Sequence, residues 1–185
     1  MQKPAGYDQA EAFTGFKVIP PGGHICKILK AEVTSTQTGR EKMILFFDIA
    51  EGDYAGYYLE QYNRKKSNNP ESNWQGTFHQ LTEDNSLPYF KGMIESIEKS
   101  NPGFEFNWDE RTLVGKLFGG VFGQEEYESR DGEIKLSTKL RFIRTVDDVR
   151  KGVEIPKIKT VNGEYREPAP RSFGGQVFPE AEIPF

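Results

Sequence analysis

The sequence is poor in the residues that build disulfides, metal clusters and most catalytic centres. Its 185 residues contain one cysteine, Cys26, and two histidines, His24 and His79. A single thiol excludes an intramolecular disulfide and a thiolate metal cluster. The two histidines lie far apart in the sequence, and no motif singles out carboxylates that would complete a metal site with them. We therefore expect no metal, no other cofactor and no catalytic activity.

Long apolar stretches are also missing. Hydrophobic residues make up 36% of the chain and the mean hydropathy is -0.67. No stretch approaches the roughly 18 consecutive apolar residues that span a bilayer, and residues 1–16 lack the apolar centre of a secretion signal. The sequence predicts a protein without a membrane partner that stays in the cytoplasm in which it is made.

Positive charge is not in excess. The chain has 24 Lys and Arg against 28 Asp and Glu, which gives a net charge of -4. Most nucleic-acid-binding domains are basic overall, so this balance opposes that function. Local patches decide more than the total, however. Aromatic residues make up 13% of the chain, and their rings can stack on bases of any sequence. Nucleic-acid binding therefore stays open.

Apolar spacing predicts three strands, one helix and two further strands. Residues 24–34 and 40–51 alternate as a hairpin would, and residues 57–65 read as a more polar, aromatic third strand. Residues 88–100 carry Phe90, Met93, Ile94 and Ile97 at helical spacing. The last two strands, 112–129 and 133–145, flank Arg130-Asp131-Gly132, which is a hairpin turn signal.

This order is typical of a mainly β, five-stranded Greek-key barrel of the oligonucleotide-binding (OB) type, with the helix between strands three and four. We expect it to occupy residues 17–152, after an N-terminal arm over 1–16. Glycines 115, 119, 120 and 123 would let the fourth strand bend as a small closed barrel requires. Residues 153–185 hold five of the eleven prolines without apolar periodicity, which predicts a flexible, disordered tail.

The chain ends in two acids followed by Ile-Pro-Phe. This end resembles the C-terminal tip of bacterial and phage single-stranded DNA-binding proteins. The resemblance implies that the terminal ring and α-carboxylate dock together in a basic-edged pocket on replication or recombination proteins, while the acids steer the encounter. The partner-binding residues would be Glu180, Glu182, Ile183, Pro184 and Phe185.

Residues 17–150 resemble a poorly characterised family of phage proteins encoded among recombination and replication genes. The similarity lies in the Pro-Gly-Gly opening of the first strand, the turn at residues 51–56 and the late strand 121–127 that ends in Glu-Glu-Tyr. It implies a phage protein in the cytoplasm of a bacterial host, with a role in DNA replication or recombination.

A single-strand binder needs cations for phosphates and exposed rings for bases, and two segments offer both. The first, on the predicted third strand and after it, contains Tyr58, Tyr62, Arg64, Lys65, Lys66, Trp74 and Phe78. On the last strand, Lys135, Lys139 and Arg141 would share one face with Arg144 nearby, while Leu136, Leu140 and Phe142 would face the core. Such a row of cations is also typical of an ordinary solvated strand.

The preferred hypothesis is non-sequence-specific binding of single-stranded DNA, with the tip recruiting partner proteins. Two alternatives stay open. The chain could be an adaptor for replication or recombination proteins that lacks DNA binding. Asp109, Glu133 and Lys135 also resemble the acid and Glu-x-Lys set of Mg²⁺-dependent nucleases, in which carboxylates hold the metal and the lysine assists the attacking water. A homo-oligomer is compatible with each hypothesis.

Overall fold

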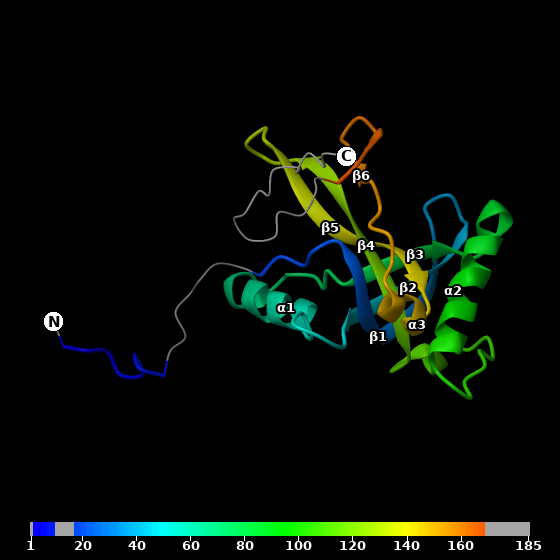
Figure 1. Cartoon of the computed structure of the whole chain (residues 1–185), viewed down its shortest axis with the longest axis horizontal. Helices are drawn as coiled ribbons and strands as arrows, with labels where there is room; N and C mark the ends of the chain where they lie inside the picture. The colour runs from blue at the N-terminus through cyan, green and yellow to red at the C-terminus, as the bar shows by residue number, and fades with distance from the viewer. Residues whose placement is uncertain (1, 10–16, 169–185) are drawn as a thin grey trace, which may run out of the picture.

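A computed structural model describes residues 2–9 and 17–168. The strands form one sheet, and Figure 1 shows helices α1 and α2 at its opposite ends. The elements in chain order are β1 (Gly22–Ser35), β2 (Glu41–Ile49), α1 (Tyr57–Asn68), β3 (Thr77–Leu81), η1 (Asp84–Ser86), α2 (Leu87–Ser100), η2 (Glu110–Leu113), β4 (Leu117–Glu128), β5 (Ile134–Arg144), α3 (Val146–Lys151), β6 (Ile158–Lys159) and β7 (Tyr165–Arg166).

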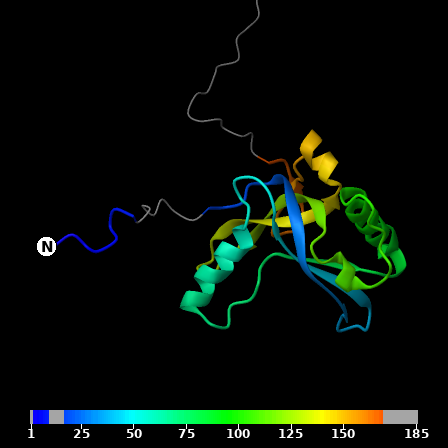
Figure 2. The same ribbon diagram turned by 90° about the horizontal axis from the view of Figure 1, so that it is seen from below.

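The seven-stranded sheet is mostly antiparallel. Its order is β3-β2-β1-β4-β6-β7, with β5 paired to β4, and only β4 and β6 run parallel. Strands β4, β1, β2 and β3 thus lie in Greek-key order. Within the described residues β3 and β5 do not pair, so the predicted closed barrel is wrong (Figure 2). Helix α2 packs against both strands and covers the core where their pairing would have closed the sheet.

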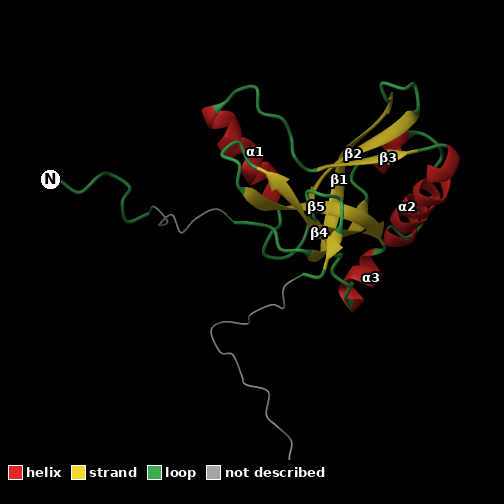
Figure 3. Cartoon of the chain, turned by 90° about the horizontal axis from the view of Figure 1, so that it is seen from above, coloured by secondary structure: helices red, strands yellow, loops and turns green. Residues whose placement is uncertain are grey.

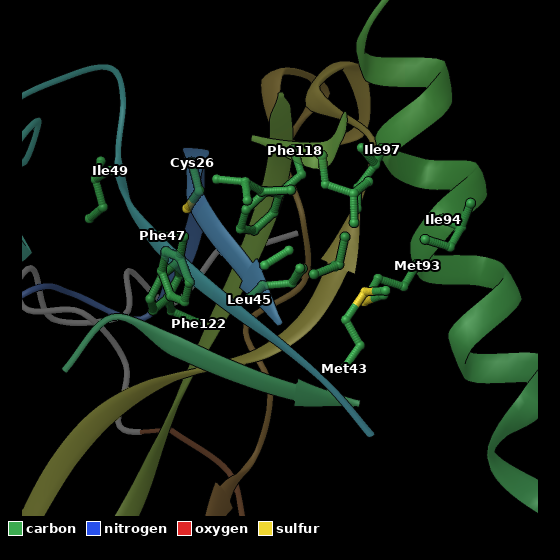
Figure 4. Packing of buried hydrophobic residues seen from close by; sticks show 14 of the residues in the cluster. Cys26, Met43, Leu45, Phe47, Ile49, Met93, Ile94, Ile97, Phe118 and Phe122 are labelled. Atoms are coloured by element: carbon green, nitrogen blue, oxygen red, sulfur yellow. The ribbon is translucent and has the colours of Figure 1, made fainter. Parts of the chain in front are cut away.

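The predicted helix is confirmed as α2, between the third and fourth strands (Figure 3). Its apolar stripe enters the core: in Figure 4, Met93, Ile94 and Ile97 point toward residues of β2 and β4. Phe47 on β2 packs edge-on against Phe118 and Phe122 of β4, with ring centroids 5.6 and 6.1 Å apart. These contacts join both halves of the sheet in one core.

The predicted third strand, residues 57–65, is wrong because this segment is helix α1. Its N-cap residue is Gly56, which has no side chain to cap the first turn. The carboxylate of Asp48 on β2 supplies the cap instead, accepting from the backbone N–H of Tyr58 at 2.9 Å and of Leu59 at 3.0 Å. The third strand of the sheet is β3, a short segment for which no strand was predicted.

The prediction that Gly115 belongs to the fourth strand is wrong, because it precedes β4 at a φ of +83°, whereas glycines 119, 120 and 123 of β4 are required by close packing rather than by barrel closure. A Cβ at Gly119 would lie 2.4 Å from the carbonyl oxygen of Thr145. A β-bulge between Val121 and Phe122 shifts the register against β5, so Ile143 is buried and Phe142 is 46% exposed. The predicted core positions of Phe142 and Leu136 are therefore wrong, and Leu136 lies on the part of the hairpin that extends past the core, at 45% exposure.

Residues 153–168, which the sequence placed in the tail, add two short strands. β6 pairs with β4 through Glu125 and Lys159, and β7 pairs with β6. Residues 169–185, with the rest of the predicted tail, lie outside the described residues. None of the described helices is long and apolar enough to cross a membrane.

Candidate nucleic-acid interface

The first predicted cluster divides between the core and the surface of α1. Tyr58 is buried, and burial raises the pKa of its hydroxyl. The Trp74 indole donates to the carbonyl oxygens of Phe47 and Gly76, both at 3.1 Å, and packs beside Tyr62 with centroids 5.6 Å apart. Tyr58 and Trp74 thus hold α1 against β2. Lys66 donates to the Tyr62 hydroxyl at 3.2 Å on the outer side, while Arg64 and Lys65 lie on the same helix.

The second predicted cluster is ion-paired across the β4–β5 hairpin. Lys139 and Arg141 both bond the carboxylate of Glu125, the latter at 3.1 Å. Burial raises the pKa of Glu125, but the Lys139 hydrogen bond and the charges of Lys139, Arg141 and Lys159 outweigh it and lower that pKa overall. Three cations therefore surround one carboxylate, which leaves this part of the sheet locally positive. Lys135, nearer the hairpin turn, pairs with Glu133 at 3.2 Å.

A groove of about 630 Å³ brings the two clusters together between α1, β3 and β5. Lys65 reaches it from α1 and Lys139 from β5, although the two lysines are far apart in the sequence. Tyr57, Tyr127 and His79 contribute rings to the same lining. The lining contains no aspartate or glutamate.

A smaller hollow of about 230 Å³ is lined by the same two strands together with α2. Arg141 and Arg144 line it beside Phe78, Tyr89 and Phe142, again without a carboxylate. The guanidinium of Arg144 stands 5.5 Å from the centre of the Phe142 ring, and Tyr89 is 71% exposed. We call the groove and the hollow together the β3–β5 seam, because both follow the opening between these unpaired strands.

The seam contains residues that sequence reasoning did not select: Tyr57, His79, Tyr89, Tyr127 and Phe142. The sequence did not place His79 in the seam because β3 was not predicted. It did not place Phe142 there because the β5 bulge shifts the register of that strand. Burial and the charge of Lys42 lower the pKa of His79, so its imidazole is neutral at neutral pH. The exposed tyrosines carried no signal in the sequence beyond their residue type.

The residues of the nuclease alternative do not form a metal centre in the described part of the chain. Asp109 precedes η2 and holds the guanidinium of Arg111 through two contacts of 2.8 Å. Glu133 and Lys135 are paired with each other at the β4–β5 turn. No group of three or more His, Cys, Asp or Glu side chains within residues 2–9 and 17–168 could hold a metal ion.

The chain matches no protein-family model, and no curated protein matches it. The predicted partner-binding residues, Glu180 to Phe185, lie outside the described residues.

Proposed function

We propose that this chain binds single-stranded DNA without sequence specificity along the β3–β5 seam, in phage DNA replication or recombination. The observation that carries the proposal is the composition of the seam. Four cations, Lys65, Lys139, Arg141 and Arg144, and several exposed rings line it, and Glu125, which bonds Lys139 and Arg141, is not part of the lining. Such a lining suits a flexible polyanion whose bases can stack on aromatic faces.

The strand order supports the same proposal. An OB fold is a partly open five-stranded Greek-key barrel that binds oligonucleotides on one face and on adjoining loops. Strands β1 to β5 have a Greek-key arrangement that is open between β3 and β5, with a helix between the third and fourth strands. We infer that the sheet is an OB-type fold left open at the seam, and that the DNA strand follows this opening.

The test compares two charge-matched double variants in binding to fluorescently labelled oligo(dT). Lys65→Ala with Lys139→Ala removes two seam cations, whereas Lys91→Ala with Lys99→Ala removes two exposed α2 lysines that pair with Glu95. The seam variant should bind more weakly and its log-log salt slope should fall by about 0.7 for each lost phosphate contact. The α2 variant should bind like the parent chain. Equal behaviour of the two variants would sink the proposal.

One observation favours the adaptor alternative as a second candidate. Lys135, Lys139 and Arg141 already have carboxylate partners within the chain, which reduces the charge available to phosphates. An adaptor would show no binding to oligo(dT) even at low salt, where phosphate contacts are strongest. It would still bind replication or recombination proteins through Ile183 to Phe185.

A further inference from the structure

A third hollow, of about 380 Å³, differs from the seam in charge and in place. It lies between the β1–β2 hairpin, the start of α2 and the loop before η2. Its apolar lining includes Met43, Phe90 and Phe106, and its charged lining consists of two carboxylates, Glu41 and Glu110, with no cation. A negative, apolar hollow repels a nucleic acid and attracts a segment that carries the opposite charge.

Trp108 stands at the edge of this hollow in a costly position. Its side chain is 79% exposed, and its indole tilts against Phe106 with centroids 5.6 Å apart. Its φ is +66°, in the left-handed region that bulky residues rarely adopt. Exposure of a large apolar ring and backbone strain at one residue both oppose folding, which points to a role outside folding.

The loop around Trp108 is fixed on both sides. Phe106 donates its backbone N–H to Glu98 of α2 at 2.8 Å, and Asp109 accepts from the N–H of Arg111 at 3.0 Å. The Asn107 side chain accepts from the N–H of Asp109 and from the Thr112 hydroxyl, both at 3.2 Å. Trp108 is therefore presented from a rigid support, which keeps the ordering cost of binding low.

We propose that this hollow docks a basic, apolar peptide segment of a partner protein. An aliphatic or aromatic side chain of the peptide enters between Met43, Phe90 and Phe106. A Lys or Arg beside it lies over the indole of Trp108 and pairs with Glu41 or Glu110. Charge selects this occupant over DNA, and the site is separate from the seam, so it stands whether or not the seam binds single strands.

The test starts from random short peptides displayed on phage and selected against the full-length protein. Selected sequences should combine Lys or Arg with Leu, Phe or Trp. As synthetic peptides they should lose affinity on the order of tenfold or more toward Trp108→Gly, as expected for a central aromatic anchor. Glu41→Gln with Glu110→Gln should also weaken peptide binding, and the difference in affinity from the parent chain should grow as the salt concentration falls. Tyr165→Ala, which removes an exposed ring on β7, should leave the affinity unchanged.

The glycine variant also separates a binding role from a structural one. Glycine adopts positive φ without strain, so Trp108→Gly should melt at the same temperature as the parent or higher while losing the peptides. Any of these results would overturn the proposal: no selected peptides, acidic selected peptides, equal binding by Trp108→Gly, or a marked loss of its stability. Self-association abolished by the variant would instead assign this face to a second copy of the chain and overturn the peptide site.

Discussion

At the scale of single residues, His79 places a titratable group in a groove that otherwise carries lysines. Its lowered pKa means that acidification adds a positive charge to the seam. Affinity for oligo(dT) should therefore rise as the pH falls from about 7.5 to about 5.5. His79→Gln should remove most of this rise, measured by fluorescence anisotropy at fixed ionic strength. An identical rise in the variant would show that other groups cause it.

Protonation of His79 has the opposite effect on folding: it lowers the stability of the folded chain. Since the folded state disfavours the charged imidazole, the unfolded chain binds more protons in the acidic range. The contribution of His79 to stability is thus present above the ordinary histidine pKa of about 6.5 and is lost as the pH falls through its lower folded value. Single-stranded DNA, which favours the cation, should reduce this loss.

Gly119 gives a second prediction at this scale. A methyl group there would meet the Thr145 carbonyl oxygen at 2.4 Å, which is backbone and cannot move aside cheaply. Gly119→Ala should lower the free energy of unfolding by about 1–3 kcal/mol, measured by urea denaturation. Gly92→Ala is the matched control. Gly92 lies within α2 with open space around it, so this change should stabilise the chain by about 0.5–1 kcal/mol.

At the scale of elements, helix α1 depends on a carboxylate supplied from the sheet. Asp48 is buried and accepts from the N–H groups of Ile49, Tyr58 and Leu59. Asp48→Ala would leave buried donors without a partner and should cost about 1–3 kcal/mol of stability. It should also weaken oligo(dT) binding, since Lys65 reaches the seam from this helix.

Circular dichroism during urea unfolding measures the stability change, and anisotropy measures the binding. The control is Asp53→Ala, which removes an exposed carboxylate from the turn before α1. If both variants unfold at the same urea concentration, the Asp48 cap does not hold the helix.

Sequence reasoning succeeded for helix α2 and failed for helix α1. Helix α2 was predictable because its apolar stripe repeats at helical spacing, β1 and β2 were predictable from their alternation, and the β4–β5 hairpin was predictable from the turn signal at residues 130–132. Residues 57–65 are rich in tyrosine, which favours strands, and the cap that decides their conformation comes from a different strand. Local propensity could not include that contact.

The seam was predictable only in part for a related reason. Both lysines of its larger groove were selected from the sequence, because charge beside aromatic residues is a local pattern. That the two lysines line one groove was not predictable, since it depends on β3 and β5 remaining unpaired. One bulge in β5, at Arg141, then exchanged the positions of Phe142 and Ile143, and period-two alternation gives no sign of a bulge.

At the scale of the whole molecule, the proposed division between DNA binding and recruitment can be tested at the chain end. Deleting Ile183 to Phe185 should leave affinity for oligo(dT) unchanged or slightly higher, because an anionic tip can compete for the cations of the seam. Binding of replication or recombination proteins should disappear, since a ring and a terminal charge are lost together.

Appending one glycine after Phe185 is the sharper version of this test. It keeps every side chain and moves only the terminal carboxylate, which a carboxylate-capturing pocket would not tolerate. The extended chain should bind oligo(dT) normally and fail to retain its partners in a pull-down. Retention equal to that of the parent chain would show that partners do not bind the tip through its terminal carboxylate.

The pairing of β6 with β4 has a consequence for solubility. β1 covers one side of β4 only as far as Phe122, and β6 joins β4 beyond it, at Glu125. Removing residues 153–185 would leave backbone N–H and C=O groups of the hairpin open to another chain, and such edges promote aggregation. The segment that the sequence assigned to a tail thus covers part of the β4 edge. A chain ending at Gly152 should form larger assemblies in light scattering, whereas one ending at Pro168 should not.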